Sequence, residues 1–381
     1  MTSNNEDKIN EVLTRGVDEI IVRESLEKKL LSGKKLRIYY GIDPTGSKIH
    51  IGHAVVLRKL KEFCDLGLDV ILLIGDFTAM IGDPDGRDEA RVPLTPKQIT
   101  ENMKDYKRQS SKILNFKKVK LKYNSTWLSK LNFQDILKLA SNFTVQQMLQ
   151  RDMFQKRIKE DKPISLQEFM YPLMQGHDSV AMDVDLEIAG NDQLFNALVG
   201  RDLQKIYRNK DKDVLVMKML VGTDGRKMSK TYNNGIYVDD ASNDMFGKVM
   251  SIPDNLINQY LELATDLKGE EIKKLGPRDQ KARLAKEIVK MYHGEEEANK
   301  AEEEFNKTFR DKNPDFTKFK YNERKIPILD FLVELDLASS KNEAKRLVLQ
   351  KAVKINGEVQ EDWQKIIETK TGMKIQVGPR K

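Results

Sequence analysis

Residues 37–58 place a strand, a tight loop and a helix in direct succession, which strongly restricts the possible folds. A β-rich run ends at Tyr40, Asp43-Pro44-Thr45-Gly46 cannot extend a strand, and apolar residues recur with helical spacing after Gly52. Residues 69–75, continuously apolar in their centre, then read as a strand buried in a parallel sheet. This strand, helix and strand unit is right-handed by default and predicts an α/β fold with a doubly wound, Rossmann-type parallel sheet that binds a nucleotide.

The loop between the first strand and the helix is a candidate site for a phosphate chain. A helix that begins at such a turn offers unpaired backbone N–H groups and a positive dipole end. His50 and His53, two of four histidines, are spaced i, i+3 and can face one ligand. The alternatives are a coincidental pair or a metal site. A metal site is the weaker of these, because no Cys is near and so few histidines cannot complete a ligand set. The loop also lacks a GxGxxG pattern.

The length of 381 residues predicts two or three domains, and the 39% hydrophobic content is ample for globular cores. We expect a cytoplasmic protein without a membrane span, because no run of eighteen apolar residues occurs and the first residues resemble neither a signal nor a transit peptide. The single cysteine, Cys64, forbids an internal disulfide and is interpreted as a core residue.

The net charge of +7 is modest, but basic residues are enriched near the C-terminus. Residues 318–381 hold 14 Lys and Arg against 9 Asp and Glu. This asymmetry predicts an anionic partner there, most simply a nucleic acid.

Two further stretches carry polar side chains that an apolar core would not need. Tyr171, Gln175 and Asp178 recur at i, i+4 and i+7, so a helix aligns a hydroxyl, an amide and a carboxylate on one face. Buried polar groups cost free energy unless paired, and a polar ligand would pair them. Residues 75–87 follow the second strand and are rich in Gly and Asp, as expected of a ligand loop; the segment that continues through Arg87 and Arg91 reads as an exposed mobile loop.

A second motif, Gly225-Arg226-Lys227-Met228-Ser229-Lys230-Thr231, completes the pattern. With His50-Ile51-Gly52-His53 before it, the ordered pair resembles the paired motifs of class I aminoacyl-tRNA synthetases. The helix with Tyr171, Gln175 and Asp178 extends the similarity over nearly the whole chain to tyrosyl-tRNA synthetases, of the bacterial type with a C-terminal S4 domain. Tryptophanyl relatives lack this helix pattern. The chain departs from the family at Ala189, where Gly is usual.

The resemblance implies roles for residues at matching positions. For tyrosine it assigns Tyr39 and Asp178 to the phenol, Tyr171, Asp83 and Gln175 to the ammonium, and Gln193 to the carboxyl region. For catalysis it implies Thr45, His50, His53, Lys227, Ser229 and Lys230. For ATP it implies Gly41, Asp43, His50, Gly52, His53, Gly190, Asp192, Lys227, Met228, Ser229 and Lys230, with Arg87 and Arg91 as a possible third arm.

The resemblance also implies three domains and several partners. Residues 1–235 form the catalytic domain, whose helical insertion at about 115–165 is expected to form a homodimer interface. Residues 236–322 read as a helical domain that contacts tRNA, and 323–381 as a small α+β, S4-like RNA-binding domain. In the last domain a Ser-capped basic helix within residues 338–348 precedes a hairpin with Asn356-Gly357 at its turn. The expected substrates are L-tyrosine, ATP and tRNA(Tyr).

The expected chemistry is attack of the tyrosine carboxylate on the α-phosphate of ATP, followed by transfer of the tyrosyl group to the tRNA 3′ end. A carboxylate with a pKa of about 4 is already ionised, so catalysis reduces to positioning and charge stabilisation. Mg²⁺ is expected to arrive with ATP, and no dedicated protein metal site is predicted. Rejection of phenylalanine would rest on Tyr39 and Asp178, which lack a partner when the ligand hydroxyl is missing.

Two other functions fit parts of this pattern. A tryptophan-activating relative would use the same two steps with another amino acid. A synthetase-derived protein that only binds RNA would keep the basic tail, although the intact histidine and lysine motifs argue against it. Exchange of pyrophosphate into ATP, measured with each amino acid, separates all three.

Overall fold

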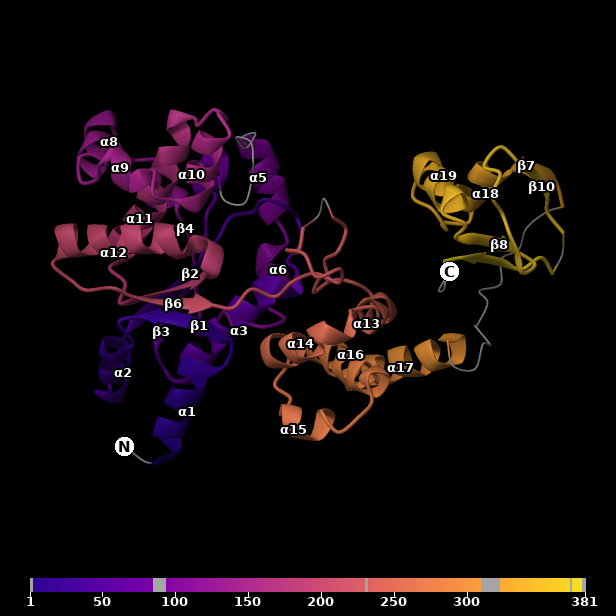
Figure 1. Ribbon diagram of the computed structural model, residues 1–381, viewed down its shortest axis with the longest axis horizontal. Coiled ribbons are helices and arrows are strands. Elements are labelled where there is room, and N and C mark those ends of the chain that lie inside the picture. The colour runs from indigo at the N-terminus through magenta and orange to yellow at the C-terminus, as the bar shows by residue number, and fades with distance from the viewer. Residues whose placement is uncertain (1–2, 85–93, 230–231, 310–322, 371, 379–381) are drawn as a thin grey trace. The chain divides into compact units, whose positions relative to one another are not determined.

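The structure is a computed structural model that describes residues 3–84, 94–229, 232–309, 323–370 and 372–378. The chain forms two compact units, Met1–Glu295 and Glu296–Lys381 (Figure 1). The expected three-domain division, with boundaries after residues 235 and 322, stays a prediction.

The first unit is built on a six-stranded sheet in the order β1-β6-β5-β2-β3-β4. Its strands are β1 (Val17–Ile21), β2 (Arg37–Ile42), β3 (Asp69–Ile74), β4 (Lys120–Tyr123), β5 (Leu186–Gly190) and β6 (Asp213–Met217). All neighbours are parallel except β1, which pairs antiparallel with β6. The chain runs outward from β2 to β4 and then returns to β5 on the other side. The carboxyl ends of β2 and β5 therefore form the switch point at which such sheets bind ligands. The predicted α/β fold is confirmed.

Helices cover both faces of this sheet (Figure 1). Helix α3 (Ile51–Asp65) packs on β2, β3 and β5, while α11 (Met170–Met182) and α12 (Leu194–Arg208) lie on the opposite face. Helices α11 and α12 approach closely through two glycines: a Cβ on Gly176 would lie 3.2 Å from the backbone nitrogen of Gly200. Cys64 is buried in α3, as expected of a core residue.

The apolar spacing of residues 7–33 predicts one or two amphipathic helices packed on the sheet, and the structure differs by placing a strand between two helices. Helices α1 (Ser3–Thr14) and α2 (Arg23–Leu31) flank the strand β1, whose Val17 and Ile21 pair with Met217 and Val214 of β6. The strand depends on a partner about 200 residues away, which a local pattern cannot reveal.

The region between β3 and β5 is mostly helical, as predicted, apart from β4. Besides α11, its described helices are α4 (Thr78–Ile81), α5 (Pro96–Met103), α6 (Tyr106–Ser110), α7 (Ser125–Leu128), α8 (Phe133–Ala140), α9 (Val145–Met148), α10 (Asp152–Lys159) and the 3₁₀ turn η1 (Leu166–Phe169). Capping boxes at Thr95, Asn132 and Thr144 begin α5, α8 and α9 by satisfying otherwise unpaired backbone N–H groups.

After β6 the unit ends in helices. These are α13 (Ser242–Met250), η3 (Asp254–Leu256), α14 (Ile257–Ala264), α15 (Gly269–Ile272) and α16 (Pro277–His293). Earlier in the chain, the 3₁₀ turn η2 (Asn191–Gln193) lies between β5 and α12. Helices α13 and α14 pack on α16, and α14 also packs on α3. In the described residues, no helix combines the length and the apolar character needed to cross a bilayer.

The second unit contains a small α+β core. Helix α17 (Glu295–Phe309) begins at the unit boundary, followed by β7 (Lys325–Pro327), α18 (Ile328–Glu334), α19 (Lys341–Leu349), β8 (Val353–Ile355), β9 (Glu358–Val359), β10 (Ile366–Glu368) and β11 (Ile375–Val377). Ser340 caps α19, and Asn356 and Gly357 turn β8 into β9 with φ of 51° and 89°. Both predictions for this segment are confirmed. Positive φ at both turn residues matches the twist of the two strands.

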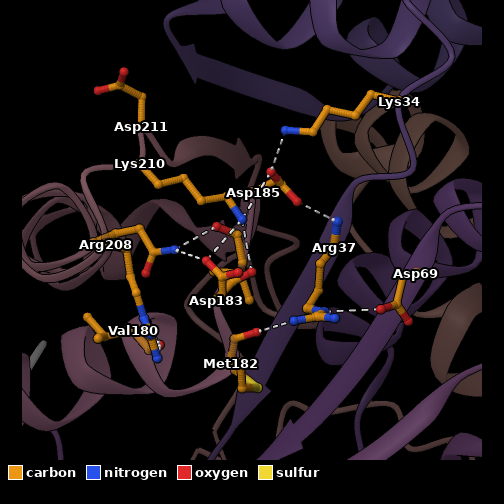
Figure 2. Close-up of polar contacts among 12 residues, drawn as sticks. Lys34, Arg37, Asp69, Val180, Met182, Asp183, Asp185, Arg208, Lys210 and Asp211 are labelled. Atoms are coloured by element: carbon orange, nitrogen blue, oxygen red, sulfur yellow. Dashed lines mark hydrogen bonds and ion pairs between the residues drawn. The ribbon is translucent and has the colours of Figure 1, made fainter.

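A charged network joins the amino ends of the parallel strands, away from the switch point (Figure 2). The Asp185 carboxylate accepts the Arg37 N–H at 2.8 Å and lies 3.2 Å from Lys210 Nζ, and the Arg37 guanidinium pairs with Asp69 at 3.0 Å. Burial raises the pKa of Asp185, but the Arg37 N–H and the Lys210 and Lys34 ammonium groups outweigh it and hold the pKa below its usual range. The network links the first residues of β2 and β3 to the segments that lead into β5 and β6.

Candidate active site

Asp43 stands at the centre of the switch point. It follows β2 and accepts hydrogen bonds from Thr78 Oγ1 at 2.7 Å and from the Tyr171 hydroxyl at 2.9 Å. Gly75 makes this approach possible, because a Cβ there would lie 1.9 Å from the Asp43 carboxylate. The first predicted motif and the predicted polar helix therefore meet through a direct hydrogen bond.

The loop of residues 44–49 is held by three side chains that sequence reasoning missed. Asn102 donates to the Pro44 carbonyl at 2.9 Å, and the Tyr106 hydroxyl donates to the Gly46 carbonyl at 2.7 Å. Gln109 is buried and forms two hydrogen bonds with the loop: it donates to the Ser47 carbonyl at 2.8 Å and accepts the Ile49 N–H at 2.7 Å. Loop and helix start are thus positioned before any ligand binds.

His50 and His53 begin α3 and lie against each other. His50 caps the helix by accepting the His53 N–H on Nδ1 at 3.3 Å, and the two rings stack with centroids 3.7 Å apart. Burial, then His53, then the Lys227 ammonium lower the pKa of His50 well below its usual value; burial and Lys227 lower the pKa of His53 to about 4. Both rings are therefore neutral at pH 7, and the effect of Lys227 places the second motif beside the first.

The second motif forms a tight loop over the same edge of the sheet. Val221 pairs with Lys227, and the Asn234 side chain accepts the Ser229 N–H at 2.9 Å. Lys227 is half exposed and its ammonium lies 2.7 Å from the Asp192 carboxylate, which follows β5. Lys230 and Thr231 lie outside the described residues, as do Arg87 and Arg91.

Helix α11 turns its three predicted polar residues toward the sheet. Tyr171 reaches Asp43, and the Gln175 amide donates to Glu187 at 3.0 Å. Asp178 is buried and accepts hydrogen bonds from Trp127 Nε1 at 2.7 Å and Asn124 Nδ2 at 3.1 Å. Burial raises the pKa of Asp178 well above its usual value, although both hydrogen bonds oppose the rise.

Tyr39, assigned by resemblance to the tyrosine phenol, points into the protein. Its hydroxyl lies 3.1 Å from Ser179 Oγ and its side chain is fully buried. Burial, then the Glu187 and Asp178 carboxylates, raise the pKa of the Tyr39 phenol well above its usual value. Tyr39 is therefore a neutral hydroxyl.

Asp83 and Gln193, which the resemblance assigns to the ammonium and the carboxyl region, are in direct contact. The Gln193 amide donates to Asp83 at 2.5 Å, and the Arg151 guanidinium lies 3.2 Å from the other carboxylate oxygen. Arg151 is buried between the rings of Phe154 and Phe195, 5.8 and 5.5 Å from their centroids. Sequence reasoning missed Arg151, which begins the basic segment of residues 151–162 and belongs to no motif.

The remaining predicted residues lie around the edge of the site or support its backbone. Gly41 and Thr45 are exposed, Met228 is buried beneath its loop, and Gly52 and Gly190 sit where a Cβ would crowd His50 and Asp192. Three missed residues, Asn124, Trp127 and Glu187, contact the predicted polar helix. Glu187 had a detectable signal, since a charge inside a buried strand requires a partner. Asn124 and Trp127 had none.

The site combines two kinds of surface. Neutral imidazoles and a lysine ammonium lie at one rim, where they can contact phosphate oxygens; buried carboxylates, an amide and hydroxyls lie beneath α11, where they can read a small polar molecule. Within the described ranges, no three His, Cys, Asp or Glu side chains are grouped to hold a metal ion.

Known proteins match the chain over nearly its full length. The family described as tRNA synthetases class I (W and Y) matches residues 31–310, and the tyrosine–tRNA ligase SYY-like C-terminal domain matches residues 304–376. Tyrosine–tRNA ligase of Thermotoga maritima is 47% identical, covering 97% of this chain and 95% of that protein. The Aquifex aeolicus tyrosine–tRNA ligase is 45% identical, covering 97% and 96%.

Solved structures share the fold at lower identity. A C-terminally truncated mitochondrial tyrosyl-tRNA synthetase of Coccidioides posadasii has a TM-score of 0.64 at 24% identity, covering 79% of this chain and 92% of that one. The tyrosyl-tRNA synthetase of Archaeoglobus fulgidus, complexed with L-tyrosine, has a TM-score of 0.62 at 22% identity, covering 78% and 99%. The resemblance found in the paired motifs is thereby confirmed: the chain belongs to the class I tRNA synthetases, in the family of the tyrosine–tRNA ligases.

Proposed function

We propose that the chain is a tyrosine–tRNA ligase, which activates L-tyrosine with ATP to tyrosyl-adenylate and pyrophosphate and then transfers the tyrosyl group to the 3′ end of tRNA(Tyr). The observation that carries the proposal is the hydrogen bond between Tyr171 and Asp43. It joins the polar helix that would select the amino acid to the loop and histidines that would hold ATP. The full-length match to tyrosine–tRNA ligases supports the same conclusion.

In the first step the tyrosine carboxylate attacks the α-phosphate, and negative charge builds on the departing pyrophosphate. Nδ1 of the neutral His50 ring accepts a backbone N–H, so its Nε2 carries the hydrogen and can donate to a phosphate oxygen. Lys227 supplies positive charge from the other rim, with Ser229 and Lys230 of the same motif as further donors. Charge stabilisation of this kind needs no general base.

Tyrosine selection would use the groups beneath α11. Asp178 is the acceptor for the phenol hydroxyl, with Tyr39 beside it, whereas Gln175, Asp83 and Tyr171 face the ammonium. Trp127 and Asn124 fix both oxygens of Asp178 in place. Phenylalanine would leave a buried carboxyl without its ligand partner, which penalises its binding.

Several finer properties are also proposed. Mg²⁺ enters bound to the ATP phosphates, and Asp43 and Asp192 contact the ribose or the metal-bound nucleotide. The second unit binds tRNA through its basic residues, in keeping with its match to the C-terminal domain of these ligases. A cytoplasmic location is proposed as well.

A homodimer is proposed through the insertion at about 115–165. Large apolar side chains are unusually exposed along this segment and just beyond it: Phe133 at 75%, Leu137 at 53%, Val145 at 63%, Ile158 at 50% and Leu166 at 81%. Exposed apolar surface of this kind marks interaction sites.

The test of the function is ATP–pyrophosphate exchange with each of the twenty amino acids, followed by charging of tRNA(Tyr). The proposal expects exchange with tyrosine alone. Exchange with tryptophan would assign the chain to the tryptophan branch, and RNA binding without exchange under any amino acid would make it a non-catalytic RNA-binding protein.

A further inference from the structure

A buried ion pair lies directly behind the proposed tyrosine site. Lys212, just before β6, and Glu187, in β5, form a salt bridge with side-chain exposures of 0% and 2%. Burial lowers the pKa of Lys212, while the Glu187 carboxylate opposes that shift. A buried pair of this kind adds little net stability compared with apolar side chains of the same volume, so its presence calls for another role.

Each member of the pair makes a second contact to the ligand-binding helix. The other oxygen of Glu187 accepts a hydrogen bond from Gln175 Nε2 at 3.0 Å, and Lys212 donates to Ser179 Oγ at 2.9 Å. Ser179 Oγ in turn lies 3.1 Å from the Tyr39 hydroxyl. The ion pair thus contacts Gln175 directly and Tyr39 through Ser179, two residues that the resemblance assigns to tyrosine.

The fold makes room for this arrangement with a glycine. A Cβ on Gly200 of α12 would lie 2.6 Å from Lys212 Nζ and 2.9 Å from Ser179 Oγ. The close packing of α11 on α12 therefore leaves a slot that fits the lysine ammonium.

The chemistry of the pair determines which end of the Gln175 amide faces the ligand. A carboxylate can only accept hydrogen bonds, so Gln175 must turn its NH₂ toward Glu187, which leaves its carbonyl oxygen for the other side. An ammonium group can only donate, so it needs that oxygen. An amide turned by 180° would present NH₂ to the ammonium and lose the bond.

We propose that Glu187 and Lys212 are positioning residues that fix the Gln175 amide with its oxygen toward the ammonium of the amino acid. Glu187 supplies the acceptor, and Lys212 holds Glu187 in place and balances its charge. The inference rests on the proposed function, because it takes the ligand to be an α-amino acid bound beneath α11.

Two double variants isolate the orienting contact. Glu187→Gln with Lys212→Met keeps an amide oxygen that can face Gln175, whereas Glu187→Leu with Lys212→Met provides no acceptor. Both remove the buried charges, so both should fold. Competition against tyrosine-dependent exchange is then measured for tyramine, which has the ammonium, and for 3-(4-hydroxyphenyl)propionate, which lacks it.

The leucine variant is expected to bind tyrosine and tyramine more weakly than the glutamine variant, each by about 10- to 150-fold, the value of one hydrogen bond to a charged group. The propionate should bind the two variants alike. Equal affinities for all three ligands would overturn the proposal, as would an equal loss for all three, which indicates general damage to the site.

The single variant Glu187→Gln gives a sharper result. Lys212 then donates to the side-chain oxygen of the new glutamine, so the NH₂ of that glutamine faces Gln175. The Gln175 amide must then rotate so that its oxygen faces residue 187 and its NH₂ faces the ligand. Tyramine should bind this variant more weakly than it binds the variant that also carries Lys212→Met; equal binding would contradict the proposal. Glu262→Gln, which breaks an exposed pair with Lys218, is the control for charge loss. Failure of the proposed function appears separately, as absence of tyrosine-dependent exchange in the unaltered chain.

Discussion

The substitution Asp178→Ala tests the proposal that Asp178 accepts a hydrogen bond from the phenol hydroxyl of bound tyrosine. It removes the acceptor of two buried hydrogen bonds, from Trp127 Nε1 and Asn124 Nδ2. Each buried donor left without a partner costs about 1–3 kcal/mol, so the stability loss is ~2–6 kcal/mol before any offset. Removing a carboxyl that burial disfavours offsets part of that loss.

The effect on recognition follows from the bond that tyrosine alone can make. A hydrogen bond contributes ~0.5–3 kcal/mol, with the upper part of this range for an ionised acceptor, which corresponds to about 2- to 150-fold in affinity. Phenylalanine has no such bond to lose. The preference for tyrosine over phenylalanine, as the ratio of kcat/KM in pyrophosphate exchange, should therefore fall by that factor.

Two further variants keep this test decisive. Asp178→Asn retains one of the two acceptors and is expected to fold more readily while still losing selectivity. Asp202→Ala removes an exposed carboxylate from α12 and should leave the ratio unchanged. A folded Asp178 variant with the same preference for tyrosine as the unaltered chain would refute the assignment.

Three other changes test separate parts of the account. Phe133→Glu should shift the protein from dimer to monomer in sedimentation experiments, because it places a charge in the proposed interface; Leu349→Glu, at an equally apolar exposed site in the other unit, should not. Lys227→Met should lower kcat for exchange at least about 10-fold while KM for tyrosine stays within about twofold, since its charge is proposed to act on the leaving pyrophosphate. The lowered pKa of Asp185 means that this group stabilises the fold above its unfolded pKa of about 3.9 and loses that contribution as pH falls. Denaturation curves of Asp185→Asn and the unaltered chain should therefore differ at pH 7 and approach each other as the pH falls below about 3.9; a constant gap would contradict the shift.

The fold could be predicted where the pattern is local. A pattern of a few consecutive residues predicts each of three elements: the buried strand that begins at residue 69, the helix after Gly52 and the Asn356-Gly357 turn. Strand β1 could not be predicted, because β6, the strand with which it pairs, lies about 200 residues further along the chain.

The candidate site was predictable in part for the same reason. The histidines, the lysine motif and the polar face of α11 each lie in a short stretch with a defined spacing. Asn124, Gln109 and Lys212 are single polar residues in unrelated segments, and only the folded chain brings them to the site. The residues proposed to bind the ligand form short patterns in the sequence, whereas most residues that hold them, Glu187 apart, do not.

The most direct test is a crystal structure with tyrosine bound. The phenol oxygen of the bound tyrosine is expected within about 3.2 Å of the Asp178 carboxylate, and its ammonium within the same distance of the Gln175 side-chain oxygen. A tyrosine whose phenol contacts neither Asp178 nor Tyr39, or whose ammonium lies away from Gln175 and Asp83, would contradict it.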